Sequence, residues 1–460
     1  MVNLIDPTSA SFLLVENRTQ PMHVGALTLM KRPEGAGREF SRELYEWMKE
    51  VGTLSPLFRK HPVRSLRTAG QLAWEDDAEF DIEHHVRHSA LPKPGRVREL
   101  LDLCGRLHAS RMDPSRPMWE SHVIEGLRDG RVAMYTKLHH SLVDGVAAVR
   151  LMQAVLSSDP HVRDMPPPWA DRPRYRRPGG DPLDLVEAVR GALSVSSEAL
   201  GLPGALGRTL TRGVRNETST ISLHAPRTML NQRITGARRF AAQDWEVSRM
   251  RAVGKATGTT INDVVVAMCS GALRRYLLDF DALPAESLVA MVPVSLKARQ
   301  AQVASTDGGN ALGSLMVALG THLESPEARL ESVHESMRAG KEALSQMTPL
   351  QVTAMSALGQ APAIAMPLLG LAGTLRPAYN LVISNVPGPR EPQYLNGAEV
   401  VGSYPLSIPI HGVALNITCS SYAGKMCFGL TGCRRTVPHL QRLLTYLDDE
   451  LKALEKIAGV

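Results

Sequence analysis

The sequence predicts a two-domain α/β (α+β layered) protein, on three observations. The chain has 460 residues, which is more than a single hydrophobic core of about 250–300 residues supports. Strand-like and helix-like segments alternate along it, as they do in layered α/β domains. A stretch rich in proline and arginine, residues 157–182, separates the two halves and is typical of a surface crossover.

The first predicted domain covers residues 1–160 and mixes both periodicities. Three segments read as strands: residues 24–30, 119–127 and 131–138. Three segments have the apolar spacing of a helix: residues 40–51, 97–112 and 145–156. Strands mixed with helices in this way favour a sheet covered by helices.

The rest of the chain is divided into a linker and a second domain. Residues 161–220 form the crossover linker and a following helix-prone stretch, and residues 221–460 form the second α/β domain. Its expected strands are residues 287–295, 379–387, 413–422 and 425–433, and its expected helices are residues 260–277 and 437–457. The helix-prone stretch runs over residues 183–215.

Composition excludes several classes of protein. Apolar residues make up 43% and charged residues 21%, as in ordinary soluble domains. The net charge of +6 suits an anionic ligand or membrane surface, and is too small to indicate nucleic-acid binding. The five cysteines are odd in number and form no C-x-x-C pair, which indicates free thiols and no structural metal. The N-terminus lacks the layout of a signal peptide, so we expect a cytoplasmic protein.

Residues 343–375 contain no charged side chain, a length sufficient to span a bilayer. However, Pro349, Pro362 and Pro367 would break one continuous helix. Two short buried or interfacial helices are therefore favoured, with partial insertion into a membrane surface as the functional alternative.

The stretch K-L-H-H-S-L-V-D-G, residues 137–145, lies where a predicted strand meets a predicted helix. Strand alternation places Lys137 and His139 on one face, and His140 falls in the turn. Asp144 directly precedes the helix and is placed to cap it. Gly145 would let another backbone approach closely. Loops of this kind, held by a rigid scaffold, concentrate functional side chains.

Three interpretations of this stretch compete. A metal site would have at most three ligands from H-H-x-x-x-D. A polar turn with a helix cap is the structural alternative. The third is a general base, because an imidazole that titrates near pH 6.5 can take a proton from an alcohol and return it later. Asp144 could then orient the ring of His140, or fix the loop through an arginine.

H-H-x-x-x-D-G resembles the active-site signature of the coenzyme-A-dependent acyltransferase superfamily. The rest of the chain is similar to one of its families, the bacterial wax ester synthases/acyl-CoA:diacylglycerol acyltransferases. The similar segments, in the family's order, are D-P-T-S-A-S-F-L (6–13), Q-P-M-H-V-G-A-L (20–27), R-P-M-W-E (116–120), T-I-N-D-V (260–264) and S-N-V-P-G-P (384–389). Met118 replaces the leucine of the family's P-L-W motif.

The resemblance implies an O-acyltransferase that moves a long-chain acyl group from acyl-CoA to a lipid alcohol. The acceptor would be a fatty alcohol, giving a wax ester, or diacylglycerol, giving triacylglycerol for storage. His140 would be the general base, with His139 in support, Asp144 fixing the loop and Gly145 permitting the turn. No acyl-enzyme is implied, and the chain lacks the nucleophile elbow G-x-S-x-G. Neither a cofactor nor a metal is expected, since acyl-CoA is a substrate.

The resemblance also implies an architecture of two chloramphenicol-acetyltransferase-like domains. Each would be a mixed sheet flanked by helices, with the active site at their interface. The crossover would connect the domains, and residues 343–375 would line an acyl tunnel or face a membrane. Peripheral association with the inner face of the cell membrane or with lipid bodies is the corresponding expectation.

A donor for the tetrahedral oxyanion is not identified by the motif, although one such donor is worth about 3 kcal/mol. The candidate substrate-binding residues are Asn262, Ser384 and Asn385, with the hydroxyls of residues 417–421. Asp263 joins Asn262 as a candidate, with a helix N-cap pair as their structural interpretation. Trp119 of P-M-W is expected in the core, and P-G-P at 387–389 is expected to form a rigid turn.

Two further histidine sites serve as comparisons. His84 and His85 form a second pair, but they lack the following D-G and sit in a charged stretch, so a solvated segment is expected. His411 is expected to be structural. Two functional alternatives stay open: a catalytically silent lipid-binding protein on the same fold, and a condensation-type enzyme that uses carrier-protein thioesters.

Overall fold

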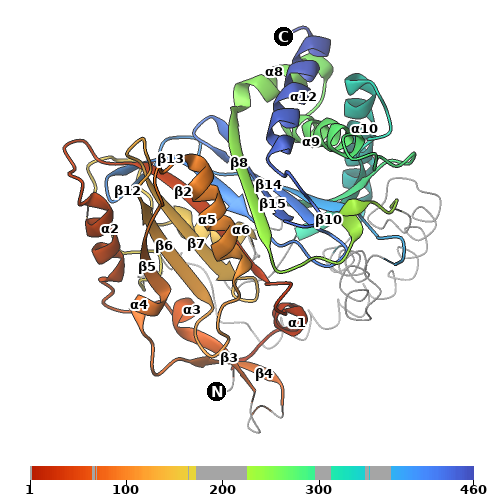
Figure 1. The fold of residues 1–460 in the computed structure, drawn as a ribbon. Helices are drawn as coiled ribbons and strands as arrows, with labels where there is room; N and C mark the ends of the chain where they lie inside the picture. Colours follow the sequence, from red (N-terminus) through yellow and green to blue (C-terminus); the bar gives the residue numbers. More distant parts are fainter. Residues whose placement is uncertain are drawn as a thin grey trace. The chain divides into compact units, whose positions relative to one another are not determined.

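The computed structural model describes residues 3–64, 68, 70–143, 145–163, 165–171, 225–295, 312–347, 352 and 374–460. The chain forms two compact units (Figure 1). Unit 1 consists of residues 1–172, 233–251 and 384–445, and unit 2 of residues 173–232, 252–383 and 446–460. This division does not follow the predicted boundaries at residues 160 and 220, because the chain returns to unit 1 twice after the linker.

The main sheet of unit 1 has the strand order β12-β13-β2-β7-β6-β5. Its strands are β2 (His23–Lys31), β5 (Val86–Ala90), β6 (Trp119–Glu125), β7 (Val132–His139), β12 (Tyr394–Leu395) and β13 (Ala398–Leu406). Neighbours are antiparallel except for β5 and β6, which are parallel. The sheet is therefore mixed, as predicted, and the three strands expected in residues 1–160 are confirmed.

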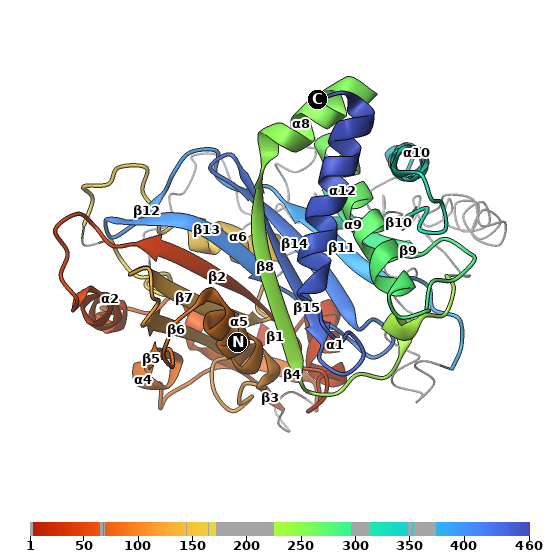
Figure 2. The same cartoon turned by 45° about the horizontal axis from the view of Figure 1, so that its top comes forward.

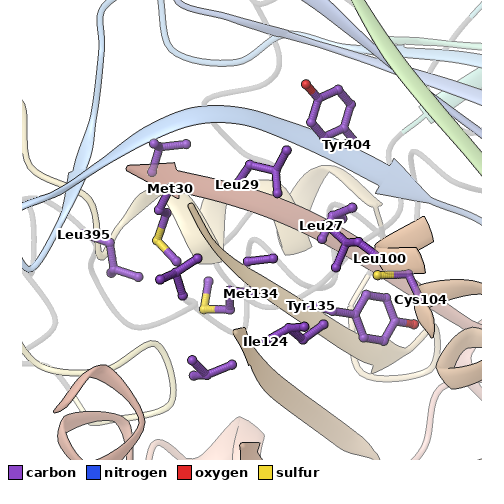
Figure 3. Packing of buried hydrophobic residues seen from close by; sticks show 14 of the residues in the cluster. Leu27, Leu29, Met30, Leu100, Cys104, Ile124, Met134, Tyr135, Leu395 and Tyr404 are labelled. Atoms are coloured by element: carbon purple, nitrogen blue, oxygen red, sulfur yellow. The ribbon is translucent and has the colours of Figure 1, made fainter. Parts of the chain in front are cut away.

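β7 is the strand that positions the histidine motif, and it lies between β2 and β6. Every residue of β7 is buried, because both faces of the sheet are covered in this region. Figure 3 shows Met134 and Tyr135 of β7 packed among apolar side chains from neighbouring strands and from helix α5 (Val97–Ala109). A fully buried central strand gives its last residue, His139, a fixed position.

The helices of unit 1 include α5 and five others: α1 (Pro7–Val15), α2 (Phe40–Lys49), α3 (Pro56–Arg59), α4 (Ile82–His85) and α6 (Gly145–Gln153). The predicted helices at 40–51, 97–112 and 145–156 are confirmed, each ending two or three residues earlier. α5 packs along strand β8 (Arg238–Glu246), as Figure 2 shows. Arg239 of β8 donates to Asp102 of α5 over 2.6 Å.

Unit 1 contains two further groups of strands. β1 (Asn3–Leu4), β4 (Leu72–Asp76) and β3 (Lys60–Arg64) are antiparallel neighbours in that order. β14 (Leu415–Tyr422), β15 (Lys425–Cys433) and β8 are also antiparallel neighbours in that order. A Cβ atom on Gly429 would lie 1.8 Å from the carbonyl oxygen of Pro405, so β15 approaches β13 at a point that only glycine permits.

Unit 2 has β10 (Leu312–Ala318) antiparallel to β9 (Val289–Ser295), and β11 (Leu381–Val386) parallel to β9. β11 runs from unit 2 into unit 1 at residues 383 and 384. The other helices that the structure describes are α9 (Ile261–Leu278) and α10 (Pro326–Ser345), together with α8 (Val247–Thr257) and α12 (Arg442–Ala458), which both begin in unit 1 and continue into unit 2. A 3₁₀ turn, η2 (Met229–Asn231), also lies in unit 2. α10 packs against α9 and β10. The last helix begins at Arg442 rather than at the predicted residue 437.

A buried ion pair joins two helical segments of unit 2, and a third helix packs closely against it. Arg329 of α10 lies 2.5 Å from Glu450 of α12, and both side chains are almost fully buried. A Cβ atom on Gly271 of α9 would lie 2.0 Å from the carboxyl carbon of Glu450, so glycine is required at that helix crossing. With mixed sheets and flanking helices in the described parts, the predicted α/β class is confirmed.

Several predicted segments lie outside the described residues. These are residues 172–224, which hold most of the linker and all of the helix-prone stretch 183–215, and residues 348–351 and 353–373 of the uncharged run. Among the helices that the structure describes, none combines the length and the apolar character that crossing a membrane requires.

Candidate active site

The His139–His140 pair lies at the end of β7, where two neighbouring chain segments hold its backbone. The N–H of His139 donates to the carbonyl of Met118, just before β6, over 2.9 Å. The N–H of His140 donates to the carbonyl of Met22, just before β2, over 2.8 Å. His23 of β2 is the register partner of His139. The predicted strand-to-turn position of the pair is therefore confirmed, with both peptide groups fixed.

The ring of His139 is fully buried and is held from one side by Ser141. Its Nδ1 accepts the Ser141 N–H at 3.2 Å and lies 2.7 Å from the Ser141 hydroxyl oxygen. Since a backbone N–H can only donate, we assign the ring proton to Nε2. Burial, with smaller contributions from His140 and Arg111, lowers the pKa of His139 to about 3. His139 is therefore neutral at pH 7 and shielded from solvent, which fits support better than proton transfer with a substrate.

His140 is only partly buried, unlike its neighbour. Its ring stacks on Phe12, with centroids 4.2 Å apart and planes inclined by 23°. Phe12 belongs to α1, which forms because Asp6 caps it by accepting the N–H of Ser9 and Pro7 occupies its first turn. The segment D-P-T-S-A-S-F-L thus builds one wall of the site.

A carboxylate that the sequence did not single out, Glu16, lies beside the pair. Its side chain is 3% exposed, and its Oε2 accepts from Arg111 Nη2 at 3.0 Å. Its Oε1 accepts the N–H of Met22 at 3.0 Å and lies 3.7 Å from His139 Nε2. Glu16 and Met22 fall within or beside the N-terminal family segments, which was the available signal. Their contact with residues 139–140 depends on the pairing of β2 with β7.

Lys137, the first residue of the motif, is buried and structural. Its Nζ donates to the carbonyls of Leu107 and Ser110 at the C-terminus of α5, over 3.1 and 2.9 Å. Glu120 Oε2 of β6 lies 3.3 Å from the same ammonium group. Burial lowers the pKa of Lys137, and Glu120 opposes that shift. This network fixes α5 against β7 beneath the histidines.

Of the two motif residues that follow the histidines, Asp144 and Gly145, the structure describes only the backbone of Gly145. Gly145 is the first residue of α6, in agreement with the predicted strand-to-helix turn. Asp144 lies outside the described residues, so its predicted role as a cap or loop anchor stays a prediction. In the described part of the chain, no group of three or more His, Cys, Asp or Glu side chains is arranged to hold a metal ion.

Asn262 and Asp263 lie in the first turn of α9, in unit 2. Asp263 and Thr260 form a capping box, in which the N–H of Asp263 donates to Thr260 Oγ1 at 3.2 Å and the N–H of Thr260 donates to Asp263 Oδ2 at 2.9 Å. Nδ1 of His334 in α10 also lies 2.9 Å from Asp263 Oδ2. Asp263 therefore caps the helix, and the substrate-binding role of Asn262 and Asp263 stays a prediction.

Ser384 and Asn385 are partly buried residues of β11, and their role as substrate-binding or oxyanion residues also stays a prediction. The segment that follows, P-G-P at 387–389, lies close against β14, and its expected rigidity stays a prediction. Gly388 donates its N–H to Ser421 Oγ at 3.0 Å, and a Cβ atom there would lie 2.1 Å from the carbonyl oxygen of Ser421. The close approach to β14 explains the glycine of P-G-P.

Trp119 of the P-M-W segment is fully buried, and its indole N–H donates to the Phe58 carbonyl over 2.8 Å. The expected core position is confirmed. His411 is likewise structural: the Ile234 N–H lies 3.1 Å from its Nδ1, and the Thr19 hydroxyl lies 3.0 Å from its Nε2.

The expectation that His84 and His85 are solvated is wrong for His85. His85 is 1% exposed, and its Nδ1 lies 2.8 Å from the carbonyl oxygen of Trp119. Its ring stacks between Phe80 and Trp119, at centroid distances of 4.9 and 4.6 Å. The short helix α4 turns this side chain inward despite the charged residues before it.

Comparison with known proteins places the chain in one family. Residues 5–265 match the family model described as the wax ester synthase/diacylglycerol acyltransferase catalytic domain, and residues 308–455 match the WS/DGAT C-terminal domain. A Mycobacterium tuberculosis protein named as a probable diacylglycerol O-acyltransferase is 45% identical over 460 residues, covering 100% of both chains.

Solved structures are similar at two levels. The wax ester synthase/diacylglycerol acyltransferase from Marinobacter aquaeolei VT8 is 42% identical, with a TM-score of 0.80 and full coverage of both chains. The first condensation domain of the calcium-dependent antibiotic synthetase has a TM-score of 0.60 over 100% of this chain and 96% of its own, at 17% identity. The second likeness concerns the two-domain fold alone.

Proposed function

Because the chain belongs to the wax ester synthase/diacylglycerol acyltransferase family, we propose that His140 is the general base of its reaction. The protein is an acyl-CoA-dependent O-acyltransferase. The observation that carries the proposal is the contrast within the pair: His139 is sealed from solvent with Nδ1 engaged by Ser141, whereas His140 is partly exposed at the end of the strand.

The proposed step transfers a proton in each direction. Nδ1 of His140 is buried, so we assign Nε2 to the acceptor hydroxyl. As Nε2 takes the hydroxyl proton, the acceptor oxygen forms a bond to the thioester carbonyl carbon and a tetrahedral intermediate results. When that intermediate collapses, the carbon–sulfur bond breaks and the imidazolium returns its proton to the thiolate of coenzyme A. The products are the ester and free coenzyme A, and no acyl-enzyme forms.

The roles of the neighbouring residues follow from their contacts. Phe12 holds the His140 ring by stacking, and the Met22 carbonyl holds its peptide. Pre-organisation of this kind lets a base meet its substrate without first being ordered. We keep Asp144 as the residue that fixes the loop and Gly145 as the residue that permits it. Asn262, Asp263, Ser384 and Asn385 remain the proposed substrate-binding residues.

We also propose that the acceptor is a diacylglycerol or a long-chain alcohol taken from a lipid surface. Both acceptors are too apolar to be abundant in water, so peripheral association with a membrane or lipid body would supply them. Two large apolar side chains near the start of the chain, Leu4 and Leu14, are 55% and 59% exposed. Leu14 lies in α1, the helix that also carries Phe12.

One assay tests the function and the lipid surface together. Palmitoyl-CoA is supplied with vesicles that contain either diacylglycerol or hexadecanol, and ester formation and flotation of the protein with the vesicles are measured. We expect ester formation with at least one acceptor, flotation, and a loss of kcat of about 10²–10⁴-fold in His140→Ala. Unchanged turnover in folded His140→Ala would overturn the base assignment, and protein that stays with the soluble fraction would overturn the surface association.

A further inference from the structure

We infer that Glu16 is a positioning residue for the reaction, holding both histidines of the pair through one carboxylate. The inference rests on the proposed role of His140 as the base. Glu16 directly follows α1 and comes four residues after Phe12, so one short segment supplies both the ring that stacks on His140 and the carboxylate beside His139.

Glu16 reaches His140 through the backbone. Its Oε1 accepts the N–H of Met22 at 3.0 Å, and the carbonyl of Met22 accepts the N–H of His140 at 2.8 Å. The N–H of Met22 is thus fixed by the Glu16 carboxylate, and its C=O is fixed by the N–H of His140. A movement of Glu16 would pass directly to the peptide that carries the base, and displacements of about 1 Å can cost about 10²-fold in rate.

Glu16 reaches His139 through space. Nε2 of His139 is buried and has no hydrogen-bond partner among the residues that the structure describes. The Oε1 atom of Glu16 lies 3.7 Å away, just beyond hydrogen-bonding distance. A buried N–H without an acceptor is unfavourable, and a neighbouring carboxylate offsets that cost. The negative charge therefore favours the tautomer that keeps Nδ1 directed at Ser141.

The surroundings of Glu16 explain why its carboxylate is tolerated at 3% exposure. Arg111 donates to Oε2 at 3.0 Å and is itself 40% exposed, which connects the buried charge to solvent. Lys137, on the same face of β7, also lies in the field of Glu16, whose charge opposes the lowering of the Lys137 pKa by burial. His140 in sequence and His23 across the strand pair are further titratable groups close to His139. A plain ion pair with Arg111 would account for Oε2, but it would leave the contacts of Oε1 with Met22 and His139 unexplained.

The test compares Glu16→Gln, Glu16→Ala and Glu16→Asp with wild type, using palmitoyl-CoA and the preferred acceptor. We expect kcat to fall by about 10-fold in the near-isosteric Gln variant and by about 10²-fold in the Ala variant. KM for palmitoyl-CoA should stay within about two-fold, since Glu16 is not placed on the substrate. Glu16→Asp should recover part of the loss in kcat.

The pH profile separates positioning from general stability. The acidic limb of kcat/KM reports protonation of the base, His140. The negative charge of Glu16 beside the pair favours the protonated form of a neighbouring imidazole, so removal of the Glu16 charge should move this limb toward lower pH. The matched control is Glu450→Gln in unit 2, which also removes a buried carboxylate paired with one arginine. It should unfold at lower temperature while kcat and the pH profile of the folded protein stay unchanged.

The outcomes are distinguishable. Folded Glu16→Gln with wild-type kcat and an unshifted acidic limb would overturn the inference, while the inactivity of His140→Ala would still support the base. Wild-type turnover in His140→Ala would overturn the base assignment and this inference with it. A fall in kcat that Glu450→Gln reproduces would assign Glu16 to stability alone and would also overturn the inference.

Discussion

His84–His85 and His139–His140 are the same dipeptide at two places in unit 1, and each pair has one sealed histidine and one ring that stacks on a phenylalanine. In the first pair the sealed residue, His85, is also the stacked one, between Phe80 and Trp119. In the second pair the two properties are divided: His139 is sealed, and the partly exposed His140 stacks on Phe12.

This division is what makes one pair suitable for chemistry. A base needs a fixed ring and access to its substrate. Of these four histidines, only His140 combines a stacking partner with partial exposure. His85 has the fixed ring without the access. Two adjacent histidines therefore do not by themselves predict a catalytic site, and the elements packed around each ring decide its role.

One expected effect of about 2 kcal/mol concerns a property that the two pairs share, the pH dependence of stability. Burial lowers the pKa of His139 to about 3 and that of His85 to about 4, from 6.5. Below pH 6.5 these two histidines bind protons in the unfolded chain but stay neutral in the folded protein. The free energy of unfolding is therefore unaffected above pH 6.5 and declines as the pH falls toward 4 and then 3. At pH 5 each histidine should cost about 2 kcal/mol relative to pH 8.

The measurement is urea unfolding at pH 8 and pH 5 for wild type, His85→Gln and His139→Gln. Each variant should lose about 2 kcal/mol less than wild type between the two pH values. A wild-type pH dependence in either variant would show that the corresponding ring is not held neutral in the folded protein.

A smaller effect separates the two stacking partners. Phe12 and Phe80 are both partly buried, and aromatic pairs contribute about 0.5–1.5 kcal/mol. Phe80→Leu should lower the free energy of unfolding by about 1 kcal/mol and leave kcat of the folded protein unchanged. Phe12→Leu should lower kcat/KM by up to about 10-fold, because the stacking of Phe12 orients the His140 ring. Equal effects of both variants on kcat/KM would remove this distinction.

Much of the fold could be predicted because periodicity is local. The strand at 131–138, the helix at 145–156 and the position of His140 between them all follow from the apolar pattern and from Gly145. The family segments predicted the acyltransferase, and the comparisons confirm it. Trp119 was predicted correctly as a core residue because it stands at the start of a predicted strand, residues 119–127.

The contacts around the motif could not be predicted, because they depend on strand pairing over long separations. Glu16 and Phe12 lie more than 120 residues before His140 in the sequence, and only the register of β2 on β7 brings them together. The prediction that His85 is solvated was wrong for a related reason. The acidic residues before it indicated solvent, but α4 packs its last side chain against Trp119, which is 34 residues away.

The most direct test of His140 as the base measures kcat and the free energy of unfolding side by side for His140→Ala and His85→Ala. We predict opposite patterns for the two variants. His140→Ala should lose about 10²–10⁴-fold in kcat with a modest change in stability, and His85→Ala should lose about 2–4 kcal/mol of stability with kcat of the folded protein preserved. Wild-type kcat in His140→Ala, or a comparable loss of kcat in folded His85→Ala, would contradict this prediction.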